Sequence, residues 1–289
     1  MFAQVVISGL TSGAVYALIA LGFVMIYKAA GVMNFAQGQI VMVGAYFAVT
    51  FRDHMGFGYP MTFLLTVAAT GLLGVVLERI FFRPLIKAAE HSVIIATVAI
   101  GIILENTVRL IFGSEFYPFR TPFSVTPIDL GGTFVTPQDL WILGITAVLF
   151  IGLYVFFEWS KWGLAMRAVA INQTGSSLMG ISVPRIFLIT WGINSALGAA
   201  AGILFAPLLA VTPIMGNAVS TSAFTAAVLG GAKSLPGAVL GGFALGIIEN
   251  MVGFYLSTAL KPLLSFAVMI AILMVRPSGL LGREEIKKV

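Results

Sequence analysis

The chain of 289 residues is 59% hydrophobic and only 9% charged, with a formal net charge of +5. A mean hydropathy of +1.04 leaves no room for a large soluble domain. The sequence contains no cysteine, which excludes disulfides, thiolate metal sites and cysteine nucleophiles. Composition therefore predicts a polytopic membrane protein whose function lies in transport, channelling or chemistry within the membrane.

Long apolar stretches follow one another along the chain. A hydrocarbon core of about 30 Å needs about 20 apolar residues for each helical crossing. The first stretch carries no charge and lacks the basic start of a cleavable signal, so we expect it to remain as the first span. Predicted spans lie near 3–27, 34–52, 61–82, 92–112, 139–158, 184–207, 217–232, 236–257 and 260–276. The expected fold is all-α, a bundle of about eight or nine transmembrane helices that forms a single domain over 1–289.

The stretch near 217–232 is the weakest of these predicted spans. It is short, rich in small residues and bounded by Pro213 and Pro236. A broken or re-entrant helix is tolerated in a membrane only where protein or a water-filled path covers its freed backbone groups. We therefore expect this stretch either to span the membrane or to re-enter it.

The basic residues indicate an orientation. With the N-terminus outside, twelve of the sixteen Lys and Arg residues lie on the cytoplasmic side, and cytoplasmic loops carry an excess of basic residues. The four left outside are Arg52, Arg109, Arg120 and Lys261. The distribution predicts an external N-terminus and a cytoplasmic C-terminus.

Two connections are long enough to have a role of their own. The outer connection, 113–138, contains four prolines and is expected to be extended and turn-rich. In the inner connection, 159–184, apolar residues recur at helical spacing, are interrupted at Gly175 and then resume. These apolar positions are Leu164, Ala168, Ile171, Leu178, Met179 and Ile181. The inner pattern predicts a short amphipathic helix at the cytoplasmic surface, with a basic loop that only anchors the topology as the alternative.

Small residues are spaced for close contact between helices. Three G-x-x-x-G pairs allow backbones to approach where no hydrophobic effect drives association between helices. The pairs are Gly198 with Gly202, Gly237 with Gly241, and Gly242 with Gly246. They predict a tightly packed bundle.

Two carboxylates, Glu105 and Glu249, are the ionisable candidates within the spans. Glu105 precedes Arg109 by four residues on one helix face, which predicts an intrahelical ion pair. Glu249 has no such neighbour, so it is protonated, bonded to another span or open to a wet cavity. The Glu-Asn pair of Glu249 and Asn250 repeats the pair at 105–106, which is either a trace of an internal repeat of the kind found in transporters or a coincidence.

The start of the second span is too polar to face lipid. Asn34 and Gln37 stand three residues apart and share a helix face, so their amides can bind a small polar solute or bond other helices of the bundle. Gln39 and Tyr46 are weaker candidates for the same path. The sequence contains no G-x-x-x-x-G-K-[ST], H-E-x-x-H or G-x-S-x-G motif, so we assign no catalytic residue and no metal ligand.

Several motifs, read in order, resemble one family. They are VMNFAQGQ at 32–39, VGAY at 43–46, RAVA at 167–170 with MGI at 179–181, AFTAAVLGG at 223–231 with LPGA at 235–238, and RPSGLLG at 276–282. Together they resemble the permease subunits of branched-chain amino acid ABC importers, and the LivH partner more than the LivM partner. The resemblance implies a type II ABC importer-like fold in the bacterial inner membrane.

The resemblance also implies a set of partners. These are a second, LivM-like permease subunit that forms a heterodimer with this chain, two cytoplasmic ATPase subunits that use ATP and Mg, and an extracytoplasmic substrate-binding protein. The chain itself would be no enzyme and would bind no cofactor. A coupling helix within 159–184 would dock on an ATPase through Arg167, Ala168, Ala170, Leu178, Met179, Gly180 and Ile181.

Departures from the family pattern widen the range of solutes. Members often have His-Gly-Glu where this chain has Gln37-Gly38-Gln39. Besides branched-chain or other hydrophobic amino acids, we therefore consider urea, short amides and small carboxylates. An autonomous secondary carrier, in which Glu105 and Glu249 couple ion flow to transport, is the alternative from a different class.

Overall fold

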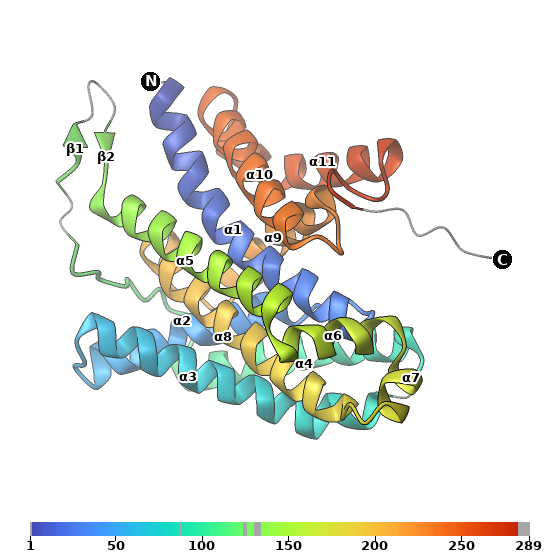
Figure 1. Ribbon diagram of the computed structural model, residues 1–289. Coiled ribbons are helices and arrows are strands. Elements are labelled where there is room, and N and C mark those ends of the chain that lie inside the picture. The colour runs from blue at the N-terminus through green and yellow to red at the C-terminus, as the bar shows by residue number, and fades with distance from the viewer. Residues whose placement is uncertain (1, 87, 124–125, 130–133, 283–289) are drawn as a thin grey trace. The chain divides into compact units, whose positions relative to one another are not determined.

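A computed structural model describes residues 2–86, 88–123, 126–129 and 134–282 (Figure 1). The tail expected in the cytoplasm, 283–289, lies outside these described residues. Apart from one short hairpin, the regular elements of the described chain are helices. The prediction of an all-α membrane protein is confirmed.

Nine helical segments correspond to the nine predicted spans. They are α1 (Phe2–Ala30), α2 (Gln37–Val49) with a π turn (Thr50–His54), α3 (Tyr59–Leu77) with its continuation to Leu85, α4 (Glu90–Phe112), α5 (Pro137–Trp159), α8 (Val183–Leu209), α9 (Met215–Gly230), α10 (Leu235–Tyr255) and α11 (Lys261–Val275). In the described part of the chain, seven are long and apolar enough to cross a membrane, whereas α2 and α9 are shorter or more polar. The weak 217–232 stretch is helical without interruption up to Gly230, the last residue of α9.

The chain divides into two compact units, each of which is described by itself. The first consists of Met1–Val24, Phe123–Val148 and Thr221–Val289, and the second of Met25–Pro122 and Leu149–Ser220. The unit boundaries fall within α1, α5 and α9, so that these helices contribute to both units.

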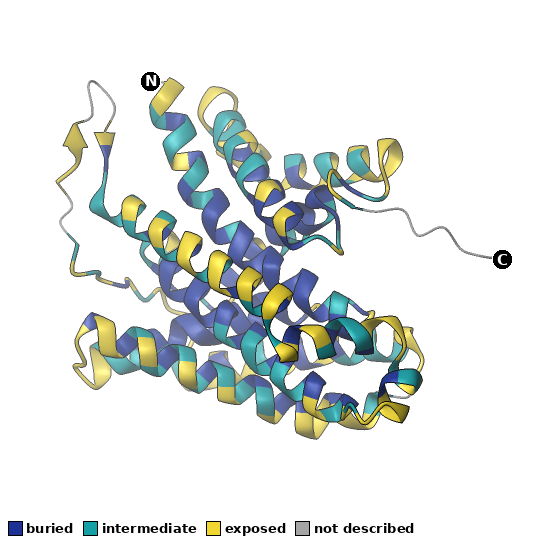
Figure 2. Cartoon of the chain, in the orientation of Figure 1, coloured by how far each residue is buried: buried dark blue, intermediate teal, exposed yellow. Residues whose placement is uncertain are grey.

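In the second unit, α2 and α8 form the interior. Nearly every residue of α2 is buried, and Figure 2 shows most of α8 buried as well. A Cβ atom added at Gly202 would lie 2.4 Å from the carbonyl oxygen of Val41, and one at Gly198 would lie 3.2 Å from the Ile40 side chain. The absence of side chains at these two glycines of α8 therefore lets its backbone approach α2.

In the first unit, α10 packs through glycines against α1 and α9. On the α1 side, a Cβ atom at Gly246 would lie 2.4 Å from the Cα of Gly13, and one at Gly242 would lie 2.6 Å from the Cα of Ala17.

On the α9 side, two more glycines of α10 make the contact. A Cβ atom added at Gly237 would lie 2.2 Å from the Gly230 carbonyl oxygen of α9, and one added at Gly241 would lie 2.2 Å from the Ala226 carbonyl oxygen. All six glycines of the G-x-x-x-G pairs thus lie at close helix contacts.

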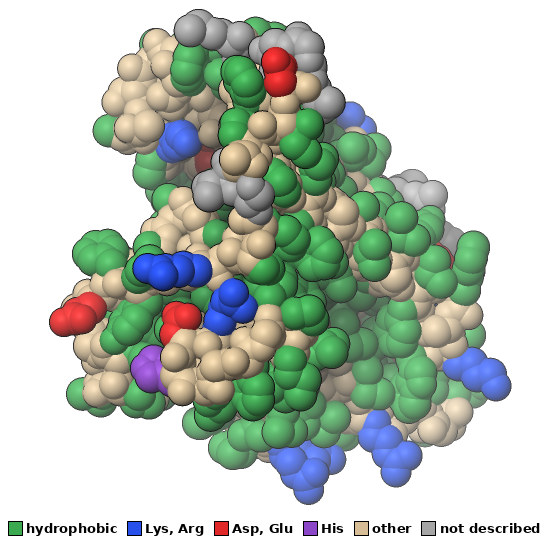
Figure 3. All heavy atoms as spheres, turned by 90° about the vertical axis from the view of Figure 1, so that its left-hand side faces the viewer, with side chains coloured by type: hydrophobic (Ala, Val, Ile, Leu, Met, Phe, Trp, Pro, Cys, Tyr) green, Lys and Arg blue, Asp and Glu red, His purple; other side chains and the backbone are tan. Residues whose placement is uncertain are grey.

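Apolar side chains remain on the outer faces of several helices. Leu64 and Leu72 of α3, Leu110 of α4 and Leu263 of α11 are exposed. Hydrophobic side chains also cover much of the face drawn in Figure 3. A lipid environment tolerates such surfaces, which would be a liability in water.

The two long connections carry the remaining elements. The outer one contains a hairpin of β1 (Ile128–Asp129) and β2 (Phe134–Val135), paired antiparallel. The inner one folds as two helices, α6 (Lys161–Ile171) and α7 (Gln173–Leu178). The predicted interruption at Gly175 was wrong: the chain breaks at Asn172, whose side chain accepts a hydrogen bond from the Gly175 amide and caps α7.

Candidate functional site

The polar start of α2 belongs to a buried amide cluster in the second unit. Asn34, Gln37 and Asn194 of α8 are all fully buried. The Asn194 amide donates to Gln37 Oε1 at 2.6 Å, and the Asn34 amide donates to the same oxygen at 3.4 Å. Asn34 also accepts from the Ala36 amide. The interior bonding that the sequence left open is therefore present.

This amide cluster retains spare hydrogen-bonding capacity. Among the described residues, Gln37 Nε2 and Asn194 Oδ1 have no partner although both are buried. A buried polar atom without a partner costs about 1–3 kcal/mol. One donor and one acceptor beside each other are suited to an ordered water or to the polar part of a passing solute.

Gln39 begins a second polar chain that joins three helices of the same unit. Its Nε2 donates to Asn217 Oδ1 at 2.6 Å, and Asn217 Nδ2 donates to Glu105 Oε2 at 3.0 Å. Arg109 donates to the other Glu105 oxygen at 2.7 Å, which is the intrahelical ion pair predicted from the spacing. The sequence reasoning missed Asn217, a polar residue in the first turn of α9.

Tyr46 lies deep in the second unit. Its ring centroid is 4.7 Å from that of Phe112 and 5.9 Å from that of Tyr117. The residue is 1% exposed, and its hydroxyl bonds to no described group. The aromatic contacts therefore fix the ring, while the hydroxyl keeps a free donor.

Glu249 occupies the centre of a polar cluster in the first unit. It is 2% exposed and accepts a hydrogen bond of 2.8 Å from the Ser222 hydroxyl of α9 and a second from the Ser265 hydroxyl of α11. The Tyr16 hydroxyl of α1 lies close to the same carboxylate. Bonding to other spans, one of the possibilities that the sequence left open, is therefore observed.

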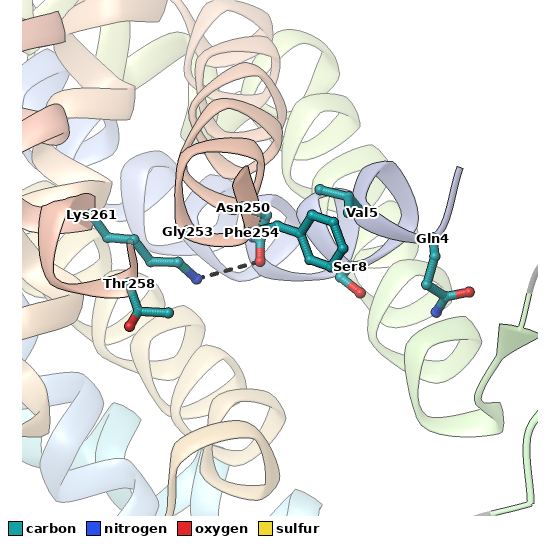
Figure 4. A pocket seen from close by; sticks show the side chains of 8 residues that line it. All are labelled: Gln4, Val5, Ser8, Asn250, Gly253, Phe254, Thr258 and Lys261. Carbon is teal, nitrogen blue, oxygen red and sulfur yellow. Dashed lines mark hydrogen bonds between the residues drawn. The ribbon is translucent and has the colours of Figure 1, made fainter. Parts of the chain in front are cut away.

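Asn250 faces an open groove in the first unit (Figure 4). Its amide donates to the Gly246 carbonyl, and its oxygen lies 3.5 Å from the ammonium of Lys261. The groove has a volume of about 450 Å³ and is lined by Gln4, Val5, Ser8, Asn250, Gly253, Phe254, Thr258 and Lys261. Asn250 and Glu249 are neighbours in sequence, yet they belong to a groove and to a buried cluster respectively.

The structure reveals a buried carboxylate that sequence reasoning overlooked. Glu78, in the continuation of α3, is fully buried, and neither of its oxygens bonds to a described residue. Thr62, Thr66 and Thr70 precede it at four-residue spacing on the same buried face. The available signal was a lone acidic residue inside the predicted 61–82 span.

The inner connection presents an apolar surface away from its own unit. Met166 and Val169 are buried, whereas Leu164, Ile171 and Leu178 are 61%, 86% and 84% exposed. The apolar positions that predicted an amphipathic helix are therefore largely the outward-facing ones. Together with Met179, also 84% exposed, they line or flank an open groove of about 600 Å³ on α6 and α7.

Arg167 fastens this connection to the end of α5. Its guanidinium donates to the Phe157 carbonyl at 2.5 Å and to the Glu158 carboxylate at 2.9 Å.

The other candidate coupling residues lie at or near the surface. Ala168 is half-buried, Ala170 is exposed, and Gly180 adopts a φ of +84° with no atom near its missing side chain. Ile181 is half-buried and lines the groove. The candidate coupling residues thus include one anchor and several surface positions.

Metal binding receives no support from the described residues. No group of three or more His, Asp or Glu side chains comes together there in a way that could hold an ion.

Comparison with known proteins decides the family. The model of the family described as "Branched-chain amino acid transport system / permease component" matches residues 5–273. The chain belongs to this permease family. It is 35% identical to the high-affinity branched-chain amino acid transport system permease protein LivH of Salmonella typhimurium over 100% of the chain and 98% of the relative. The corresponding protein BraD of Pseudomonas aeruginosa is also 35% identical, with the same coverage.

A solved structure agrees with the fold. PsaBC from Streptococcus pneumoniae, in complex with Fab, matches this permease with a TM-score of 0.53 over 96% of the chain and 93% of the solved chain. At 14% identity this likeness bears on the fold alone. The permease is a multi-pass membrane protein with a type II importer fold, and its family leaves ATP hydrolysis to a separate subunit.

Proposed function

We propose that this permease is the LivH-type subunit of an ATP-binding cassette importer that carries branched-chain amino acids across the bacterial inner membrane. The observation that carries the proposal is the full-length identity of 35% to LivH and BraD, both named for high-affinity branched-chain amino acid transport. Because the alignment leaves no large part of either chain unmatched, this chain corresponds to the whole length of those relatives and not to one part of them.

The partners follow from this assignment. A LivM-like permease subunit completes the heterodimer, two cytoplasmic subunits hydrolyse ATP with Mg, and an extracytoplasmic protein delivers the solute. The N-terminus and the outer connection, 113–138, face outward, whereas 159–184 and the C-terminus face the cytoplasm. The distribution of basic residues supports this orientation.

Coupling to the ATPases is assigned to α6 and α7. A docking element has to contact both the partner and the spans. The exposed side chains of Leu178 and Met179 provide apolar contact area, and Arg167 holds α6 against the end of α5. Force applied to the exposed face of α6 therefore reaches α5 through direct hydrogen bonds.

The translocation path is assigned to Asn34, Gln37, Gln39 and Tyr46 in the second unit and to Glu249 and Asn250 in the first. Unpaired polar atoms at Gln37, Gln39 and Tyr46 support this role, because a passing solute can bond them for part of the cycle. Glu249 is already bonded by hydroxyls from α9 and α11 and contributes mainly by holding those helices together.

One observation favours a second solute class within the same transporter type. Gln37 and Gln39 are neutral amides, which suit urea or short amides.

The test is reconstitution of the complete importer in proteoliposomes with its binding protein. We expect ATP-driven uptake of leucine, isoleucine or valine, with no uptake when the ATPase subunits are omitted. Uptake of urea or acetamide in place of these amino acids would shift the solute class. Uptake by this chain alone, driven by an ion gradient, would instead favour a secondary carrier.

A further inference from the structure

The Glu105–Arg109 ion pair lies on an accessible face of α4. The side chain of Glu105 is 16% exposed and that of Arg109 is 41% exposed. Ionised side chains within a span rarely face lipid and almost always face the bundle interior, a partner or a water-filled cavity. This face of α4 therefore belongs to water or to protein in the assembled importer.

The pair is held in place from two other helices. Asn217, in the first turn of α9, donates to Glu105 Oε2, and Gln39 at the start of α2 donates to Asn217. The carboxylate is therefore fixed by an amide on one oxygen and by the guanidinium on the other. The Glu105 side chain is thus held by more partners than in an ordinary surface ion pair, which forms without support from neighbouring helices.

The cluster keeps hydrogen-bonding capacity for a further partner. A guanidinium has five donors in a planar fork, and within the described residues the guanidinium of Arg109 hydrogen bonds to Glu105 alone. Gln39 Oε1 is buried beside this chain and has no described partner. Gly101 leaves room for it, since a Cβ atom there would lie 3.3 Å from this oxygen. The cluster thus offers spare donors at Arg109 and a spare acceptor at Gln39.

These groups match the two charges of a free amino acid. An α-amino acid carries a carboxylate and an ammonium on one carbon, and a guanidinium binds a carboxylate by parallel hydrogen bonds. The partly exposed Glu105 carboxylate can accept from the ammonium. Exposed Ile102, one helical turn before Glu105, offers apolar contact to a hydrophobic side chain.

We propose that Glu105 and Arg109, supported by Asn217 and Gln39, form a zwitterion-binding step of the translocation path. The proposal rests on the importer function proposed above and deepens it. A zwitterion satisfies both charges of the pair, whereas urea, a short amide or a simple carboxylate leaves at least one charge without an ionic partner. The cluster therefore favours α-amino acids over the other solutes considered.

The experiment uses the complete importer in proteoliposomes with a saturating amount of its binding protein. Three variants are compared with the unaltered complex: Glu105→Gln, Arg109→Gln and the exchange Glu105→Arg with Arg109→Glu. Leucine uptake and ATPase activity with and without binding protein are measured. Arg79→Gln, which removes an exposed cation from the third span region, is the matched control.

Both single variants should lose about tenfold or more of leucine uptake while still co-purifying with the ATPase subunits, because each leaves one charge of the solute unpaired. The exchanged pair keeps an intrahelical ion pair but reverses its polarity toward Asn217, so it should not restore uptake. Unchanged uptake in the single variants, or full restoration by the exchange, would overturn the proposal and leave the pair as a helix-stabilising contact.

Two further outcomes are separable. If the single variants fail to assemble, Arg109→Lys keeps the charge but removes the planar fork, and uptake equal to that of the unaltered complex would then overturn the proposal. If the unaltered importer carries no amino acid, the proposed function itself fails. Normal amino acid uptake that is insensitive to these substitutions contradicts only the zwitterion-binding step.

Discussion

At the scale of single residues, the buried polar groups are of two kinds. Some hydrogen bond to other helices, and others have atoms without a partner. Glu249 is bonded by two hydroxyls from other helices, whereas Gln37 Nε2 and the Tyr46 hydroxyl have no described partner. In a membrane bundle, a satisfied polar group contributes to packing and an unsatisfied one costs free energy. Free polar atoms are therefore the better candidates for transient contact with solute.

Substitution of Glu249 tests the first of these roles. Glu249→Gln keeps an acceptor oxygen for Ser222 and Ser265, whereas Glu249→Leu leaves both hydroxyls without this acceptor. We expect Glu249→Leu to destabilise the purified permease complex by about 1–3 kcal/mol more than Glu249→Gln, as measured by thermal unfolding in detergent. Equal unfolding temperatures and equal uptake in the two variants would show that hydrogen bonding at this position is dispensable.

At the scale of elements, glycine determines which helices can touch. The α2 and α8 backbones approach at Gly202, where a Cβ atom would lie 2.4 Å from the Val41 carbonyl oxygen. By contrast, a Cβ atom at Gly152 of α5 would have no neighbour within 4 Å. Two glycines within helices thus have opposite structural consequences, although sequence context alone does not separate them.

These two glycines provide a matched pair of substitutions. Gly202→Ala should force α2 and α8 apart and cost about 1–3 kcal/mol, as overpacking of a tight contact does. Gly152→Ala should be neutral or stabilise the protein by up to about 1 kcal/mol, because alanine is the better helix former. Thermal unfolding of the two variants provides the measurement. A loss of stability at Gly152 similar to that at Gly202 would contradict the packing argument.

The α6–α7 connection carries the coupling prediction. Replacing Leu178 and Met179 together by aspartate should weaken ATPase docking and reduce stimulation of ATP hydrolysis by the binding protein, because two side chains that are each 84% exposed lose their apolar contact area. Thr174→Asp, at an exposed position of the same helix, adds charge without removing an apolar side chain and is the control.

Membrane insertion in these α7 variants should remain normal, since α7 lies between spans. Co-purification with the ATPase subunits and uptake assays distinguish the outcomes. Full coupling in the double aspartate variant, or an equal defect in Thr174→Asp, would remove this surface from the ATPase interface.

At the scale of the whole molecule, orientation is the main expectation to be measured. The natural absence of cysteine allows single cysteines to be introduced and labelled from one side of the membrane. Position 115 lies in the outer connection, on the side of the membrane that carries few basic residues. A cysteine there should therefore react with an impermeant maleimide from outside. A cysteine at position 161 should react only after permeabilisation. External labelling at 161 would reverse the assignment of the inner connection.

The sequence by itself determined the helical architecture and the family. Apolar length marked nine spans whose positions agree closely with the observed helices, because lipid requires continuous backbone hydrogen bonding within each crossing. The spacing of Glu105 and Arg109 likewise predicted their ion pair, since four residues along a helix bring two side chains together. Local periodicity suffices for such features.

Only the tertiary structure decided which polar residues meet. Gln37 and Asn194 are 157 positions apart and bond across α2 and α8, while Asn217 links Gln39 to Glu105 on a third helix. No local pattern marks such pairs, because they depend on the rotation and close approach of whole helices. The same holds for α6, where Leu164 and Ile171 of the predicted apolar stripe lie outward, whereas Met166 and Val169 are the buried residues. Periodicity in the sequence shows that a helix has an apolar face, and tertiary packing decides whether another element covers that face.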